Sequence, residues 1–315
     1  MKRFNKTIVA ATMAVGMFAI QAPSYAAPTL VGADAILRLD NFIFTVNDGS
    51  GARQASVNDL NIQNGANNGN TSAAIDGNSS SFNGNSPLGA SMNIQQAVVN
   101  PANALSNNNY NSFFTGSYGT GTSQTAFADA DLAGSSILGL GVGPYAVSAD
   151  TRATAGLETG SIGDATSNLG LLVTFDFIAT GDFTLGFSTG YDWTAYTFLD
   201  PTAGALGANA QASTSWMVTV TNSTTGAVVG RVTPDELNNT FGALNAGEIG
   251  GFQNQVGNIA YDIGELVTGQ RYTLNLRHTT EADVSRGRIP EPGIIALMGL
   301  GFLGMTLVTR RRMEV

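Results

Sequence analysis

The sequence predicts an all-β protein. Its body is expected to be an antiparallel β-sandwich of jelly-roll-like form, with a long Asn/Gly/Ser-rich loop region, followed by a C-terminal transmembrane helix. Three observations support this class: apolar and polar residues alternate over short runs, Gly, Asp and Asn mark the turns, and few stretches have helical periodicity. The chain has 315 residues. Its central part of about 260 residues is long enough to bury the core of one large β domain or two small ones.

The first strand signal covers residues 35–46, which favour β structure and predict one or two strands, ended by a turn at 47–50. From residue 58 to residue 125, Asn, Gly, Ser and Ala dominate. Such side chains bury too little surface to offset the conformational entropy of the chain on their own. We therefore expect 58–125 to be either disordered or a loop-rich cover with short strands. Within it, 94–99 fits a helix turn or a strand equally well.

The clearest strand pattern lies between residues 169 and 278. Residues 222–226 form a hairpin signature. A brief helix is expected at 234–237, with Thr233 as a candidate N-cap. The strands expected in this region are 171–178, 183–188, 193–199, 215–221, 227–232 and 271–278.

Composition excludes several classes of function. The chain has no cysteine, so disulfides, thiol catalysis and thiolate metal sites are excluded. Its lysines are Lys2 and Lys6, and residues 27–289 hold 8 Arg against 21 Asp and Glu, a net charge of −13. Nucleic-acid binding is disfavoured because a phosphate backbone requires clustered cations. An acidic surface suits solubility outside the cell and divalent cations, or it is simply a solvated surface.

Residues 1–26 are predicted to be a signal peptide. Positive charge at the start is followed by a mostly apolar run at 7–20, which is too short for a stable membrane span. Small residues at 24 and 26 then occupy the −3 and −1 positions of a cleavage site. We expect cleavage after Ala26, the alternative being a retained anchor. The exported body then comprises residues 27–287, and residues 288–315 form a separate tail.

The tail begins with a rigid motif made of Pro290, Glu291, Pro292 and Gly293. The two prolines fix φ and lack N–H donors, so this stretch is expected to be extended and to lie outside the helix behind it. An extended, accessible peptide is the form that a processing protease requires.

A short helix and a positive cluster complete the tail. The uncharged, mostly apolar run at 294–308 spans about 22 Å as a helix, which is short of the roughly 20 residues that a comfortable span needs. Arg310, Arg311 and Arg312 follow it, favour a cytoplasmic C-terminus and are expected to stop translocation. The alternative is a plain membrane anchor with two incidental prolines.

The tail resembles the PEP-CTERM sorting signal of Gram-negative bacteria, because the Pro-Glu-Pro motif, the Gly-rich apolar helix and the Arg cluster occur in the same order. The extension at 313–315 departs from that pattern. The resemblance covers the end of the chain only. It implies export, a transient hold in the inner membrane through the helix, and processing at or near the motif by an exosortase-type membrane transpeptidase. The resemblance implies nothing about the activity of the body.

No cofactor is expected. Among inorganic ions, calcium is the partner that the sequence favours. Asp129 and Asp131 are two residues apart and precede a turn glycine, Gly134. Calcium takes about six to eight oxygen ligands, and weak sites occur in extracellular modules. The alternative is that Asp and Asn in turns bond to the backbone.

Aromatic residues suggest a carbohydrate-binding surface. Trp193, Tyr196 and Trp216 could stack on sugar rings, because these side chains combine flat apolar area with a polar group. The alternative is core packing, since large aromatics at alternate strand positions face inward by default.

We do not expect an enzyme. A glycoside hydrolase needs two carboxylates facing one cleft, and the pairs Asp176 with Glu158 and Asp182 with Asp192 are the candidates considered. The single histidine, His278, is expected to be a surface residue of a strand.

The sequence therefore favours an exported structural protein of the cell surface or the extracellular, biofilm-type matrix. The alternative is a carbohydrate-binding module of the exopolysaccharide matrix, with a glycoside hydrolase behind it.

Overall fold

The computed structural model describes residues 31–75, 77–88, 90–99, 125–133, 147–157, 163–199, 208–243 and 252–286. All of them belong to one compact unit, residues 28–287, and the terminal segments 1–27 and 288–315 lie outside that unit. The predicted signal peptide, the sorting tail and its helix, and Glu158 therefore lie outside the described residues.

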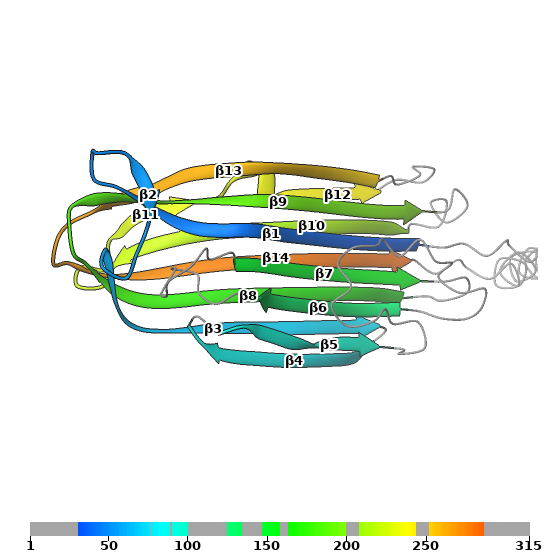
Figure 1. Ribbon diagram of the computed structural model, residues 1–315. Coiled ribbons are helices and arrows are strands. Elements are labelled where there is room, and N and C mark those ends of the chain that lie inside the picture. The colour runs from blue at the N-terminus through cyan, green and yellow to red at the C-terminus, as the bar shows by residue number, and fades with distance from the viewer. Residues whose placement is uncertain are drawn as a thin grey trace, which may run out of the picture. The chain divides into compact units, whose positions relative to one another are not determined.

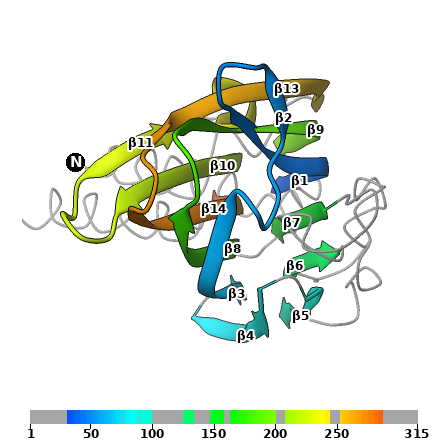
Figure 2. The same ribbon diagram turned by 60° about the vertical axis from the view of Figure 1, so that its left-hand side comes forward.

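The body consists of two seven-stranded antiparallel sheets (Figure 1), which confirms the all-β class. Figure 2 shows the two sheets as facing layers. The arrangement fits the predicted sandwich, while its jelly-roll-like form stays a prediction. In sheet order, sheet A contains β13 (Phe252–Leu266), β9 (Phe183–Leu199), β1 (Val31–Asn47), β7 (Val147–Leu157), β6 (Thr125–Ala133) and β5 (Met92–Val99), with β2 (Ala52–Gln54) paired to β1. Sheet B contains β11 (Val228–Val232), β10 (Asn209–Asn222), β14 (Arg271–Arg286), β8 (Gly163–Ala179), β3 (Leu60–Ile75) and β4 (Asn78–Pro87), with β12 (Asn239–Ala243) paired to β10.

Several strands are longer than the sequence predicts. The expected strands 183–188 and 193–199 are both parts of β9, which pairs with β1 on one side and β13 on the other. Residues 35–46 lie in the single strand β1, whose pairing with β7 has a bulge between Leu39 and Phe42, where Asn41 takes a positive φ of 54°. The bulge lets one strand change its pairing register without ending.

The Asn-rich segment is more regular than predicted. Within 58–125, the described residues form β3, β4, β5 and the start of β6, and β3 alone has 16 residues. The reason is pairing: β3 lies between β8 and β4 and exchanges backbone hydrogen bonds with both. Residues 94–99, left open between helix and strand, belong to β5.

The expected helix at 234–237 is a single 3-10 turn, η2 (Asp235–Leu237). Its N-cap position is Pro234, and no side chain caps it. The prediction of Thr233 as N-cap was therefore wrong.

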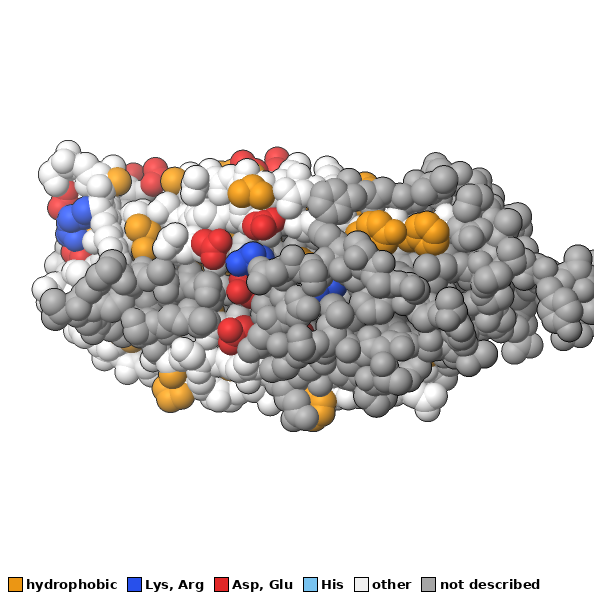
Figure 3. Space-filling view, turned by 45° about the vertical axis from the view of Figure 1, so that its right-hand side comes forward, with side chains coloured by type: hydrophobic (Ala, Val, Ile, Leu, Met, Phe, Trp, Pro, Cys, Tyr) orange, Lys and Arg blue, Asp and Glu red, His pale blue; other side chains and the backbone are white. Residues whose placement is uncertain are grey.

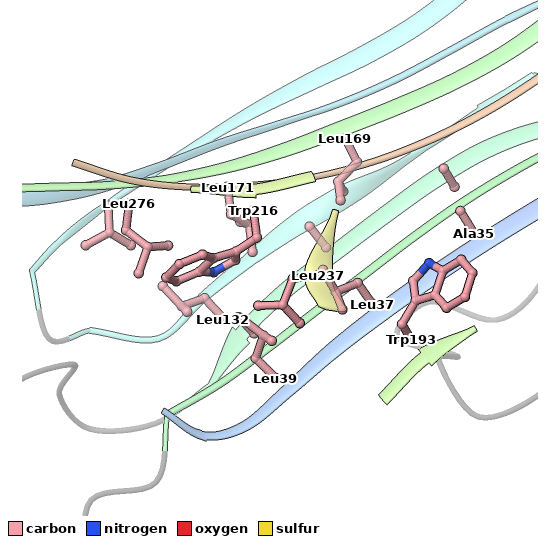
Figure 4. Close-up of a cluster of buried hydrophobic side chains, with 14 of the residues drawn as sticks. Ala35, Leu37, Leu39, Leu132, Leu169, Leu171, Trp193, Trp216, Leu237 and Leu276 are labelled. Atoms are coloured by element: carbon pink, nitrogen blue, oxygen red, sulfur yellow. The ribbon is translucent and has the colours of Figure 1, made fainter. Parts of the chain in front are cut away.

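An aromatic cluster joins the two sheets at the centre of the core. Trp216 of sheet B lies 4.8 Å from Phe187 and 6.0 Å from Phe42 of sheet A, measured between ring centroids. Phe44 meets Phe175 across the sandwich at 6.0 Å. Figure 4 shows Trp216 and Trp193 among buried leucines. Offset and edge-on ring pairs at these distances stabilise a core beyond their buried area.

Glycines allow the sheets to meet closely along one side of the sandwich. A Cβ on Gly230 of β11 would stand 1.8 Å from the carbonyl oxygen of Ile263 in β13, and one on Gly264 would stand 2.9 Å from the carbonyl oxygen of Val229. Only glycine permits such an approach between two backbones. The edges of sheets A and B are therefore packed directly against each other here.

Removing the central indole should strongly destabilise the body. We expect Trp216→Ala to lower the free energy of unfolding by about 3–5 kcal/mol, because it deletes a fully buried aromatic side chain and leaves a cavity. Urea denaturation would measure the change. Val256→Ala is the control, because Val256 is 70% exposed and should change stability by no more than about 0.5 kcal/mol. Equal effects of the two substitutions would contradict the packing described.

Candidate functional site

The predicted calcium ligands lie on the outer face of sheet A. Asp129 and Asp131 are on β6, opposite Arg152 and Asp150 of β7 respectively. Asp129 is buried, and burial raises the pKa of Asp131. Within the described ranges, no three or more His, Cys, Asp or Glu side chains are grouped so that they could hold a metal ion. Calcium binding therefore stays a prediction, and the guanidinium opposite Asp129 counts against a second cation at that point.

Asp150 has an unusual environment beside this pair. Burial raises its pKa to about 6, against the opposing effect of Arg38, whose Nε lies 3.7 Å from the carboxylate. The negative charges of Asp40 and Asp131 raise the pKa further. Figure 3 shows acidic side chains gathered around basic ones on one face of the body. Asp150 therefore changes charge near pH 6.

A fully buried ion pair occupies the same sheet face. Arg152 contacts both carboxylate oxygens of Asp34, and its Nε donates to Oδ1 at 3.1 Å. Thr154 Oγ1 donates to the same oxygen at 2.8 Å. All three residues have no exposed surface. The neighbouring strands β1 and β7 are thus tied by a charged network as well as by their backbone ladder.

The structure corrects the carbohydrate prediction for both tryptophans. Trp193 and Trp216 are 1% and 0% exposed and point into the core, so neither presents a ring to a sugar. Tyr196 lies on β9 and is half-buried, and burial raises the pKa of its hydroxyl. The three aromatic side chains are therefore not brought together on one surface.

His278 is a core residue, which corrects its expected surface position. It is 0% exposed, and Thr151 of sheet A lies 2.8 Å from its Nε2 across the sandwich. Thr151 Oγ1 donates its single proton to the carbonyl oxygen of Leu37 at 3.2 Å. It must therefore accept a hydrogen bond from Nε2–H, which leaves Nδ1 as the unprotonated nitrogen, with no hydrogen-bond partner among the described residues. Burial lowers the pKa of His278 to about 3, so the ring is neutral.

Of the carboxylate pairs considered for hydrolysis, Asp182 and Asp192 do not converge, whereas the pair of Asp176 with Glu158 stays a prediction because Glu158 lies outside the described residues. Asp182 lies in the turn before β9 and accepts hydrogen bonds from Thr268, whereas Asp192 lies well within β9 and accepts one from Asn254. Ten residues of extended chain separate them by about 33 Å. Asp176 on β8 is paired with Arg271 at 3.0 Å.

A groove of about 800 Å³ on the outer face of sheet B was missed by the sequence analysis. It crosses β3, β4, β8 and β14, which come from three separate stretches of the chain. The sequence did contain a signal, because β3 and β4 each carry two asparagines two residues apart, the spacing of neighbours on one strand face. The asparagines that line it are Asn68, Asn70, Asn83, Asn85 and Asn168.

Comparison with known protein families assigns the C-terminal tail to a known motif. The family model of the PEP-CTERM protein-sorting motif matches residues 288–312. The chain therefore carries a PEP-CTERM sorting motif, as the resemblance of the tail implied. No curated protein and no solved structure was found to match the chain. In the part of the chain that the structure describes, no helix has the length and apolar character needed to span a bilayer.

The buried histidine should make stability depend on pH. Because the pKa is lowered in the folded state, the unfolded chain binds the extra proton between pH 6.5 and about 3. Stability should therefore fall as the pH drops through this window, by about 1.4 kcal/mol per pH unit from this group. The raised pKa of Asp150 acts in the opposite direction between pH 3.8 and about 6. We expect His278→Gln to remove the histidine contribution, measured as the difference between the variant and the original protein in urea denaturation at several pH values. A pH-independent difference would contradict the buried neutral ring.

Breaking the buried ion pair should cost more than removing it. We expect Asp34→Ala to destabilise the body by about 3–5 kcal/mol, because it leaves the guanidinium of Arg152 buried without its carboxylate. The double variant Asp34→Leu with Arg152→Met should recover most of that loss, since apolar residues of similar volume often replace buried ion pairs without cost. Chemical denaturation of the single and double variants would measure both effects. A double variant less stable than the single one would contradict this account.

Proposed function

We propose that the protein, after the export, membrane-anchored sorting and exosortase processing that its sorting motif implies, serves as a structural component of the cell surface or of the extracellular matrix. The observation that carries the proposal is the motif at 288–312, placed directly after an all-β body.

The body has properties that suit such a role. Its two sheets bury a continuous apolar core, and its outer faces carry mainly polar side chains. Charged networks tie neighbouring strands without any disulfide, since the chain has no cysteine. Such a body would keep its fold outside the cell whatever the redox state there.

The two alternatives are supported to different degrees. The burial of Trp193 and Trp216 removes the aromatic support for carbohydrate binding, whereas the Asn-lined groove on sheet B supports it. Glycoside hydrolysis has the weakest support, because Asp182, in the turn before β9, and Asp192, within β9, are far apart. We therefore propose a non-enzymatic role, and a lack of sugar release from matrix polysaccharide by the purified protein would agree with it.

The tail should determine the size and the location of the mature protein. We expect the extracellular form to lack the residues after about Pro292, and mass spectrometry would show this. Replacing Pro290 and Pro292 by alanine should leave the chain uncleaved and retained in the inner-membrane fraction. Pro101→Ala is the control for the same change outside the motif. An extracellular form that still ends at Val315 would overturn the proposed processing.

The surface or matrix role needs a test of its own. We expect cell fractionation to find the processed protein in the outer-surface or matrix fraction, and a strain without it to have a weakened matrix. A processed protein recovered only as a free species in the medium, with an unchanged matrix in the deletion strain, would leave the sorting intact and refute the structural role.

A further inference from the structure

The groove on sheet B contains a regular array of amide side chains. Asn68 of β3 faces Asn85 of β4, and Asn70 faces Asn83, in two successive rows on the same face of the sheet. Side chains on one face are separated by about 5 Å between strands and by about 7 Å along a strand. Four amides therefore stand at fixed spacings in a small area.

These amides match the hydrogen-bonding character of hydroxyl groups. Each carboxamide offers donors and an acceptor, as does a sugar hydroxyl. Asn85 Nδ2 donates to Asn68 Oδ1 at 2.8 Å, which fixes the orientation of that row. This bond does not use the NH₂ group of Asn68 or the carbonyl oxygen of Asn85, which are the groups of this row that can bond to a ligand. The second row, Asn70 and Asn83, has the same composition.

Gly170 makes the hollow beside this array. It lies on β8 in register with Asn70 of β3 and Thr279 of β14. A Cβ at Gly170 would stand 3.0 Å from Asn70 Oδ1 and 3.6 Å from Thr279 Cγ2, so any side chain here would fill the space between its neighbours. Leu172, on the same strand face, is 38% exposed and adds an apolar surface. The groove therefore offers a ligand several hydrogen-bonding groups and one apolar contact.

The charge in the groove differs from that of the rest of the body. Its lining residues include no Asp or Glu, and Arg277 is the charged residue among them. Four other arginines pair with aspartates, whereas Arg277 makes no ion pair with the residues that the structure describes. The body, residues 27–287, holds 7 Arg against 21 Asp and Glu, a net charge of −14, whereas in this groove an anionic group meets a cation rather than a carboxylate. The groove therefore suits a neutral or acidic ligand and not a cation.

We propose that this groove on the outer face of sheet B binds a glycan chain, with the four amides bonding its hydroxyls, Leu172 contacting a ring face and Arg277 accommodating a carboxylate if the sugar has one. The proposal deepens the proposed surface or matrix function, on which it rests, because it names the kind of polymer that the body holds. It uses different residues from the sorting motif, so the two can fail separately.

The first experiment measures binding of the exported protein to exopolysaccharide extracted from its host, by affinity electrophoresis. We expect the double variant Asn70→Ala with Asn83→Ala to lose at least tenfold in affinity. Gly170→Val should have a similar effect by filling the hollow while keeping all amides. The control is Asn93→Ala with Asn258→Ala, which removes two exposed amides from sheet A. Thermal denaturation of every variant shows whether the fold is retained.

The second experiment distinguishes neutral from acidic sugars. A cellohexaose and a hexagalacturonate are titrated as probes, and Arg277→Gln should weaken the binding of the uronate alone, more strongly at low salt. Arg231→Gln is the matched control, since Arg231 is an exposed arginine outside the groove. No binding of the extracted polysaccharide, or binding unaffected by both groove variants, would overturn the proposal. If in that case the original protein is still cleaved at its tail and the variant with alanine at positions 290 and 292 is still not, the sorting stands and only the glycan site falls.

Discussion

The contact between Trp216 and Phe187 is the interaction on which the rest of the structure depends. It joins β10 of sheet B to β9 of sheet A at the centre of the core, and Phe42 of β1 packs against the same ring pair. Because the sheets are fixed there, their strands hold the two outer faces in position. The groove on sheet B and the charged cluster on sheet A are thus surfaces of one packed core.

Sequence periodicity predicted the strands best where apolar and polar residues alternate, as in 171–178 and 271–278, which lie in β8 and β14. It divided β9 in two, because Gly190 and Asp192 resemble a turn when their pairing with β1 is unknown. It also underestimated β3, whose asparagines favour turns locally. Pairing with β8, about 100 residues away along the chain, supplies what local propensity lacks. Composition alone gives no information on such a partner.

The sites were harder to predict than the strands. The sorting motif was recognisable because its parts are contiguous, whereas the groove joins residues from four strands that only the sheet topology brings together. The phase of β14 would have placed His278 inside, since Tyr272, Leu274 and Leu276 share its face. The polar character of the His278 side chain suggested a surface position instead. The hydrogen bond to Thr151 resolves the conflict, because it satisfies Nε2 within the core.

The placement of the basic residues affects how long the protein survives among secreted proteases. Between Ala27 and Gly287 the chain has no lysine, and each of its arginines lies in a β-strand. Arg152 is completely enclosed. Trypsin-like enzymes cut most readily in exposed loops and at chain ends, and in the described part of the body no loop offers them a basic residue. Arg288, next to the Pro-Glu-Pro motif, is the next such residue along the chain, so digestion after basic residues would trim the tail and spare the body.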